Sequence, residues 1–258
     1  MSKVQITAFT GEYYFLSNYC TCPITIDGLT YRSAEAAFQA AKCSDPIDRA
    51  AFCTVPPNVA KAIGRKIKLR DGWEKERDGI MADIIHAKFS QNPGFAQALI
   101  DTDDAELIEG NTWNDNYWGM CGCTRCRSEG TKGLNKLGKI LMAERARLQG
   151  YPDGWTDLGD WVDSKGKTHK AADTPRYKAL GNSIALPQWY YVLGGIADRL
   201  PDNATLGSLF DGIGGFPYVW AQLHDGRKEL CVWASEIEEF PIAVTKKWFP
   251  EVEDGRLF

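Results

Sequence analysis

The stretch SAEAAFQAAK, residues 33–42, carries the strongest structural signal in the first half of the sequence. Ser33 is a good helix N-cap, because its hydroxyl can accept a hydrogen bond from a backbone amide of the first turn. The helix that follows places four side chains with different chemistry on one stripe, separated by small alanines: Glu35, Phe38, Gln39 and Lys42. This stripe is either a solvated helix face or the lining of a polar, sugar-sized pocket.

The segments around this helix predict a domain of short strands and amphipathic helices. Upstream, the sequence favours short strands in VQITAF, YYFLSNY and PITIDGLTY, the last folded at an Asp27-Gly28 turn. Downstream, Pro56-Pro57 opens a helix, and a long helical pattern runs through WEKERDGIMADIIHAKFSQN. A polar loop over 119–133 and a helix in LNKLGKILMAERARLQ complete this part, which ends between residues 145 and 150.

Composition limits the class of protein. The 258 residues carry a formal net charge of −4, with 44% hydrophobic and 25% charged residues, which suits one large or two small globular domains. This charge balance gives no electrostatic signature of nucleic-acid binding. The sequence has no apolar run of transmembrane length and its first residues do not resemble a signal peptide. We therefore expect a cytoplasmic protein with reduced cysteines and no membrane partner.

Five fragments of the first 145 residues occur in a recognisable order: FLSNY, SAEAAFQAAK, IGRKIKLRDGWEKERDGIM, NDNYWG and GLNKLGKILMAER. Together they closely resemble the NADAR, or YbiA-like, family of N-glycosidases. The resemblance implies a helix-rich α+β domain over residues 1–148 that hydrolyses N-glycosidic bonds without a required cofactor. The substrates it implies are ribosylamino intermediates of the riboflavin pathway or ADP-ribose attached to a guanine base, including a base in modified DNA.

The same resemblance assigns roles to individual residues. Glu35 falls on the family's active-site glutamate in the pattern S/T-x-E-x-x-F-Q, where a carboxylate would stabilise oxocarbenium-like charge and activate water. Asp115 is the candidate second catalytic group, and Lys42 and Arg65 suit phosphate oxygens. The other candidates for substrate binding are Asn18, Gln39, Trp73, Trp118 and Gly119. Core packing is an equal alternative for each tryptophan.

A cysteine-rich stretch follows Trp118. CGCTRC spaces three thiols as C-x-C-x-x-C, at Cys121, Cys123 and Cys126, which is a partial signature of a structural zinc site. A fourth ligand would have to come from elsewhere in the chain, where Cys20, Cys22 and His86 are available. The alternative is a set of reduced thiols in an ordered loop.

Residues 149–258 differ from the first part in composition and in pattern. The stretch TLGSLFDGIGGFPYVWAQ, residues 205–222, combines an apolar strand, a Gly-rich loop and a helix, as in the first nucleoside-binding turn of an α/β domain. Residues 150–173 are loop-like.

Four fragments of this part resemble motifs of the C5-cytosine DNA methyltransferases: ARLQGYPDGWTD, TPRYKALGNSIALP, TLGSLFDGIGGF and WASEIEEFPIAVTKKWFP. Their order is circularly permuted, with that family's C-terminal motifs first. The resemblance implies a partial Rossmann-like segment over 149–258 that binds S-adenosylmethionine, built on two parallel strands. It also implies that the Gly181-Asn182-Ser183 turn closes over the cofactor. The cofactor contacts that it implies are Asn182, Ser183, Phe210, Asp211, Gly212, Ile213, Gly214, Gly215, Glu236 and Ile237. That family's Pro-Cys and Glu-Asn-Val motifs are absent, and Cys231 is expected in the core. Methylation would therefore need a second methyltransferase polypeptide or further sequence.

Three functions follow from these patterns. The first is an N-glycosidase acting on an ADP-ribosyl or ribosylamino compound through Glu35. The alternative is a subunit or fragment of a DNA cytosine methyltransferase. The third is an ADP-ribose or NAD sensor that binds without cleaving.

Overall fold

The computed structural model describes residues 4–254, and the chain divides into two compact units. The first unit spans residues 1–101 and 106–145, and the second spans 102–105 and 146–258. Within the described residues, no helix is both long and apolar enough to cross a membrane.

The strands of the first unit form three small sheets. β2 (Thr21–Ile26) pairs antiparallel with β3 (Leu29–Ser33), and Asp27 and Gly28 make the turn with φ values of 51° and 77°. Two positive φ angles are what a tight two-residue hairpin requires, so the predicted turn is confirmed. Two parallel pairs complete the set: β1 (Gln5–Ile6) with β4 (Glu106–Leu107), and β5 (Gly110–Asn111) with β6 (Met120–Cys121). The strand expected in YYFLSNY is wrong, because residues Gly11–Leu16 form a 3-10 helix, η1.

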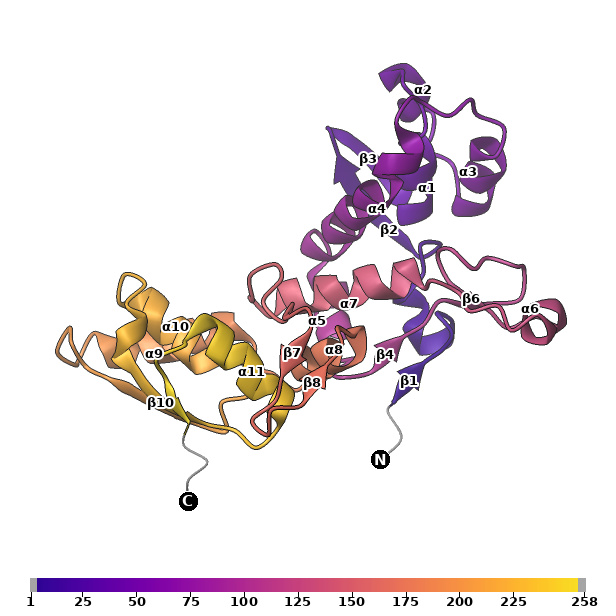
Figure 1. The fold of residues 1–258 in the computed structure, drawn as a ribbon. Helices are drawn as coiled ribbons and strands as arrows, with labels where there is room; N and C mark the ends of the chain where they lie inside the picture. The colour runs from indigo at the N-terminus through magenta and orange to yellow at the C-terminus, as the bar shows by residue number, and fades with distance from the viewer. Residues whose placement is uncertain (1–3, 255–258) are drawn as a thin grey trace. The chain divides into compact units, whose positions relative to one another are not determined.

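Helices make up most of the regular secondary structure of the first unit. They are α1 (Ala34–Ala40), α2 (Pro46–Ala50), α3 (Pro57–Gly64), α4 (Trp73–Ser90), α5 (Pro93–Ile100), α6 (Thr124–Ser128) and α7 (Lys136–Leu148). The Ser33 hydroxyl accepts a hydrogen bond from the Ala36 amide at 3.2 Å, which confirms the predicted N-cap. Every residue of α1 is buried, and α1 packs against α3, α4 and the β2–β3 hairpin (Figure 1). The interpretation of α1 as a solvated face is therefore wrong.

The core of this unit includes four charged side chains among the described residues: Glu35, Lys88, Glu144 and Arg145. The stripe that the periodicity predicts on α4 consists of Ile80, Ile84, Ile85, Lys88 and Phe89. It is buried except for Ile80, which is half-buried, and Lys88 is fully buried. The Lys88 Nζ donates to the Ser17 carbonyl at 2.9 Å. Burial lowers the pKa of Lys88 to about 8, because the interior disfavours the charged form.

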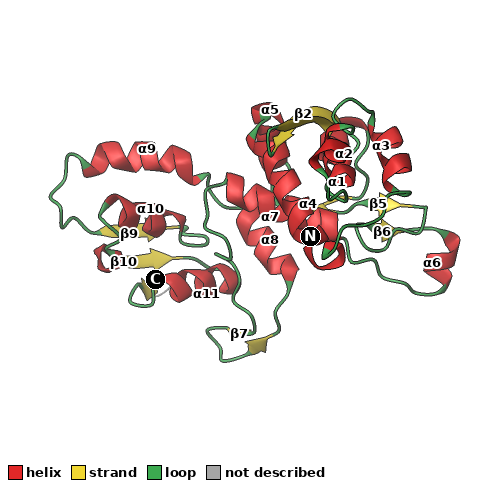
Figure 2. Cartoon of the chain, turned by 90° about the horizontal axis from the view of Figure 1, so that it is seen from above, coloured by secondary structure: helices red, strands yellow, loops and turns green. Residues whose placement is uncertain are grey.

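The second unit contains a parallel sheet in the order β11-β10-β9. The strands β9 (Leu206–Leu209), β10 (Cys231–Ser235) and β11 (Glu253–Asp254) alternate with the helices α10 (Gly215–Leu223) and α11 (Glu239–Trp248). The 3-10 helix η2 (Lys228–Leu230) leads into β10. Figure 2 shows β9 and β10 side by side with α9 (Leu186–Ala197), α10 and α11 around them. The sequence led us to expect only two strands, because the short third strand has no apolar run to mark it.

The stretch before this sheet is more ordered than the sequence suggests. A small antiparallel hairpin joins β7 (Trp161–Val162) to β8 (Thr168–His169), and α8 (Asp173–Gly181) follows. Trp155 stacks on Trp248 with ring centroids 4.8 Å apart, and its Nε1 donates to the Ile213 carbonyl at 2.8 Å. The description of residues 150–173 as loop-like is thus wrong in part, because aromatic packing fixes one end of this stretch against the Gly-rich loop and a hairpin orders its middle.

Candidate functional site

Glu35 lies in the first turn of α1 with its carboxylate in the protein interior. The residue is 6% exposed, and its Oε1 accepts a hydrogen bond from Gln39 Nε2 at 2.8 Å. Its backbone amide donates to the Asn18 carbonyl at 3.0 Å, which fixes the start of the helix. Because Glu35 and Gln39 stand one helical turn apart, the amide can hold the carboxylate in one orientation.

Burial and nearby cations act on this carboxylate in opposite directions. Burial raises the pKa of Glu35, while Lys61, the Gln39 hydrogen bond, Lys42 and Arg65 each lower it. Burial is the largest of these effects, so the net pKa lies above the ordinary value. The site therefore holds a carboxyl group with weakened preference for its charged form, next to three positive side chains.

Lys42 lies just beyond α1 and faces the same region. Its Nζ donates to the Gly64 carbonyl at 3.3 Å, so it bridges the ends of α1 and α3. Burial lowers the pKa of Lys42, and the Glu35 charge partly opposes this shift. Arg65, at the C-terminus of α3, is exposed. The structure thus brings the predicted cations Lys42 and Arg65 to the Glu35 carboxylate, together with Lys61, which the sequence analysis did not identify.

Aromatic rings pack on Phe38 beside the site. The ring of Trp73 lies 5.1 Å from that of Phe38, and the ring of Trp118 contacts Phe38 edge-on at 5.3 Å. Trp73 is only 5% exposed, so most of its surface is used in packing. Trp118 is half-buried and is the better placed of the two to contact a ligand.

The loop between β5 and β6 holds Asp115 in a fixed geometry. Asp115 Oδ1 accepts hydrogen bonds from the amides of Tyr117 at 3.0 Å and Trp118 at 2.9 Å. The Asn111 side chain brackets the same residue, donating to the Asp115 carbonyl at 2.7 Å and accepting from its amide at 3.1 Å. These four bonds orient the loop that carries Trp118.

Glu109 is a third carboxylate in this region that the sequence analysis missed. Its pKa is raised to about 7, chiefly by burial and also by the charges of Asp115 and Glu35, while Lys61 and Lys88 oppose the shift. The negative charges of both predicted catalytic acids therefore act on Glu109. The only signal in the sequence is its position in AELIEGN, directly after an apolar strand-like run.

The remaining residues predicted to bind substrate in this unit differ in their contacts. Gly119 is required by packing, because a Cβ there would stand 2.1 Å from the Glu109 carbonyl oxygen. The Asn18 amide group lies 3.5 Å from the Met81 sulfur. Within the part of the chain that the structure describes, Asn18 Oδ1 and Gln39 Oε1 are buried acceptors with no hydrogen-bond partner. A buried polar atom without a partner is costly, so each of these atoms suits a ligand hydroxyl or amine.

The three predicted zinc ligands do come together. The sulfur atoms of Cys121, Cys123 and Cys126 all lie within 4.8 Å of one another. The expected fourth ligand is wrong for all three candidates: neither Cys20 nor Cys22 nor His86 joins this group among the described residues. His86 instead has its Nδ1 3.0 Å from Glu144 Oε1.

The Gly-rich loop of the second unit has the backbone that its glycines predict. Gly212 and Gly214 have φ values of 61° and 81°, and a Cβ on Gly215 would stand 2.5 Å from the Tyr151 hydroxyl. Phe210 and Ile237 follow the ends of β9 and β10 and are 89% and 85% exposed. Ile213, in contrast, is fully buried. Phe210 and Ile237 both lie just after the carboxyl ends of adjacent parallel strands, the edge at which open α/β sheets bind ligands.

The polar side chains predicted to contact a cofactor at this loop are hydrogen-bonded to other groups of the protein. Asp211 is 5% exposed, and its two oxygens accept from the hydroxyls of Ser208 at 2.6 Å and Thr245 at 2.9 Å. Glu236 accepts from the amides of Gly212 and Ile237 at 2.9 and 2.6 Å. The Ser183 hydroxyl bonds to that of Tyr151, and Asn182 ends α8 as its C-cap. Cys231 is 3% exposed, which confirms its assignment to the core.

Comparison with known proteins first defines the class. A family model described as the NADAR domain matches residues 7–149, more than half of the chain. The chain belongs to this family. The similarity supports a hydrolase that acts on N-glycosyl bonds.

The chain is also similar to individual known proteins. The chain is 36% identical over 148 residues to the N-glycosidase YbiA of Escherichia coli (strain K12), covering 56% of this chain and 88% of that protein. A solved NMR structure of E. coli YbiA matches 57% of this chain and 87% of that one, at 34% identity and a TM-score of 0.49. The riboflavin biosynthesis protein VVA0006 of Vibrio vulnificus (strain YJ016) is 33% identical over 153 residues, 58% of this chain and 39% of that protein.

A weaker similarity involves a methyltransferase. The DNA (cytosine-5)-methyltransferase DRM2 of Oryza sativa subsp. japonica is 30% identical over 125 residues, which are 48% of this chain and 19% of that protein. A match to so small a part of the relative does not establish a methyltransferase domain.

Proposed function

We propose that the protein hydrolyses the bond between ribose and a nitrogen atom in an ADP-ribosylated or ribosylamino substrate. The observation that carries this proposal is the buried carboxylate of Glu35, held by Gln39 and facing three cations. A carboxylate in a water-poor site stabilises positive charge on a departing sugar far better than one in water.

The reaction needs a base for water and an acid for the leaving nitrogen. As the C1′–N bond breaks, its electron pair goes to nitrogen, and positive charge develops on the ribose beside Glu35. Water attacks C1′ and gives its proton to Glu35. Glu109, whose pKa of about 7 leaves it partly protonated at neutral pH, supplies a proton to the leaving nitrogen. The sum is one water consumed, one ribose hydroxyl formed and one N–H formed.

Substrate recognition would use the groups around these acids. Lys42, Lys61 and Arg65 give the region more positive than negative charge near Glu35, which suits the phosphates of an ADP-ribosyl group or ribose phosphate. The unpartnered oxygens of Asn18 and Gln39 suit sugar hydroxyl donors. The name of the Vibrio relative favours a ribosylamino compound of riboflavin biosynthesis as one substrate to test. Guanine-linked ADP-ribose in DNA is the other.

The test is release of sugar from both substrates. Glu35→Ala should abolish cleavage of ADP-ribosylated DNA or of the ribosylamino compound, followed as free ADP-ribose or ribose phosphate, with the melting temperature nearly unchanged. Glu12→Ala, which changes an exposed acid in the same unit, is the matched control and should retain activity. A large fall in melting temperature would make Glu35 structural. Binding without release by the unaltered protein would favour the sensor.

A second candidate function is binding of S-adenosylmethionine by the second unit, as part of a split methyltransferase. The exposed Phe210 and Ile237 at the ends of parallel strands, beside a loop with left-handed glycines, favour it. In this candidate function the adenosine would lie against the two exposed apolar side chains, and the cofactor would supply the methyl group when bound. Calorimetric titration with S-adenosylmethionine should give binding that Phe210→Ala weakens about tenfold or more. Absence of heat with the unaltered protein would exclude this candidate.

A further inference from the structure

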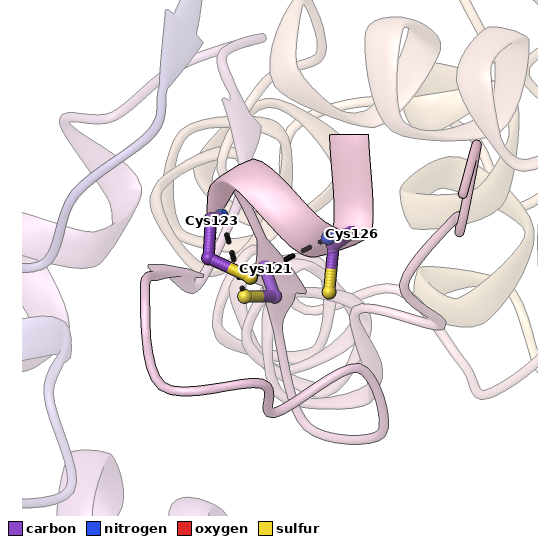
Figure 3. A group of neighbouring side chains, drawn as sticks. All are labelled: Cys121, Cys123 and Cys126. Carbon is purple, nitrogen blue, oxygen red and sulfur yellow. Dashed lines mark hydrogen bonds between the residues drawn. The ribbon is translucent and has the colours of Figure 1, made fainter. Parts of the chain in front are cut away.

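The cysteine group stands on two short elements joined by a tight turn. Cys121 ends β6, Cys123 is the N-cap of α6, and Cys126 lies on α6 itself. Figure 3 shows the three side chains directed at one space between the end of β6 and α6. Cys121 and Cys126 are buried, while Cys123 is half-buried, so the group opens to solvent on one side.

Nitrogen donors contact all three sulfur atoms, and Asn114 Oδ1 accepts from the Cys126 thiol at 3.1 Å. The amides of Asn114 and Cys123 donate to Cys121 Sγ at 3.2 and 3.5 Å, and the amide of Cys126 donates to Cys123 Sγ at 3.5 Å. The side chain of Asn116 donates to Cys126 Sγ at 3.3 Å. Donors aimed at sulfur compensate the negative charge of thiolates, and such outer partners commonly support metal-bound thiolates.

The spacing of the sulfur atoms is close to that of a tetrahedral site. With metal–sulfur bonds of about 2.3 Å, thiolates around zinc stand roughly 3.8 Å apart. The observed separations of at most 4.8 Å need only small side-chain movements to reach it. Thiolate ligands select zinc and other soft metals over magnesium or calcium.

We propose that Cys121, Cys123 and Cys126 bind one zinc ion, with a solvent molecule in the fourth position on the side where Cys123 is accessible. Binding displaces one proton from each thiol into solvent, and no oxidation takes place. The site does not depend on the proposed glycosidase function, because its ligands, charge and geometry are its own.

The metal would also position the loop of Asp115. Asn114 and Asn116 both contact the cysteine group, and Asn116 Oδ1 accepts from the Cys121 amide at 3.0 Å. Asp115 lies between them, and its carboxylate orients Tyr117 and Trp118. An ion that locks the sulfur atoms therefore locks this loop from one end. Only this positioning role rests on the proposed function.

Cobalt titration of the reduced, metal-free full chain tests the site. Co²⁺ should bind at about one ion per chain, with the sulfur-to-cobalt charge-transfer and visible d–d bands of a tetrahedral thiolate site, and Zn²⁺ should displace it. Cys123→Ser should weaken Co²⁺ binding about a hundredfold or more, and Asn116→Ala about tenfold. Cys53→Ser, a half-buried cysteine outside the group, is the matched control and should bind as the unaltered protein does.

Two results would overturn the proposal. One is the absence of thiolate-to-cobalt bands from a protein whose three thiols are shown by titration to be reduced. The other is bands that survive in Cys123→Ser and Asn116→Ala with circular dichroism unchanged. The cobalt bands report metal binding and not sugar release. If the protein releases no sugar, the bands should still appear, and if the bands are absent, sugar release by Glu35 can still be measured.

Discussion

Two carboxylates buried to the same degree, Glu35 in the first unit and Asp211 in the second, differ in how they are satisfied. Glu35 is 6% exposed and Asp211 is 5% exposed, and burial raises the pKa of both. Among the described residues, one side chain, Gln39, donates to Glu35. Both oxygens of Asp211 are bonded to hydroxyls, those of Ser208 and Thr245.

The difference separates structural acids from reactive ones. A buried acid whose acceptors are filled stabilises the fold, because removing it leaves its donors without partners. A buried acid with free acceptor positions and adjacent cations costs stability and retains capacity for a substrate. By this criterion Asp211 ties β9 to α11, while Glu35 is available for chemistry.

The largest expected effect comes from removing each acid. Glu35→Gln should lower the rate of sugar release about a thousandfold or more, because the neutral amide neither stabilises positive charge nor accepts a proton from water. Its free energy of unfolding should equal or exceed that of the unaltered protein, since the amide fills the same space and removes a buried charge. Rates of sugar release and urea denaturation measure the two quantities.

Asp211→Ala is the counterpart and should behave in the opposite way. It should lower the free energy of unfolding of the second unit by about 2 to 3 kcal/mol, since two buried hydroxyls lose their acceptor. Sugar release should be unchanged at temperatures where both units are folded. Equal losses of activity in the two variants would contradict the distinction.

A smaller effect is expected from the contact that holds Gln39. A Cβ on Gly64 would lie 1.9 Å from Gln39 Oε1 and 3.0 Å from Gln39 Cβ, so Gly64→Ala must displace the amide that orients Glu35. We expect sugar release to fall about a hundredfold through loss of this orientation. Gly79→Ala on α4 is the control, because a Cβ there has open space, and it should stabilise the helix by about 0.5 to 1 kcal/mol. Full activity in Gly64→Ala would show that the Gln39 contact is dispensable.

The smallest effect concerns the pH response of Glu109. Its pKa is about 7 in the folded chain against an ordinary 4.5, so between these values the folded state holds a proton that the unfolded state has lost. The contribution of Glu109 to stability is therefore complete below pH 4.5 and is lost as the pH rises through 7. From about pH 5 to about pH 8, the unaltered protein should lose roughly 1 to 2 kcal/mol relative to Glu109→Gln.

The same titration should appear in the rate of reaction. Sugar release by the unaltered protein should fall about tenfold for each pH unit well above the pKa of Glu109, as the acid loses its proton. Glu109→Gln should be slower throughout and lack this fall. A high-pH limb that persists in Glu109→Gln would assign the acid to another group.

Local patterns predicted the parts of the fold that depend on neighbouring residues. The Ser33 cap, the Asp27-Gly28 turn and the stripe on α4 all follow from capping, turn geometry or periodicity, and all are present. The YYFLSNY segment failed because its aromatic residues suit a strand, while their partners in the fold place them in a 3-10 helix. The third strand β11 is two residues long in the described chain and gives no pattern to detect.

The site was predictable only where its residues share one helix. Glu35, Gln39 and Lys42 come from adjacent turns, so spacing alone placed them together. Glu109 and Lys61 join them from elements far away in the sequence, and their role depends on burial and on charges that only the folded chain brings near. Family resemblance supplied Asp115, but the bonds that fix it could not be derived from its motif.

The buried amine of Lys88 can be used to measure local opening of the first unit. An acylating reagent in solvent cannot reach a fully buried Nζ that donates to the Ser17 carbonyl until α4 separates from that segment. The rate at which such a reagent labels Lys88, compared with the rate for the exposed Lys75 on the same helix, therefore measures how often α4 opens locally. Because Ser17 adjoins Asn18, whose carbonyl anchors the Glu35 amide, a ligand that steadies the α1 region should slow that labelling.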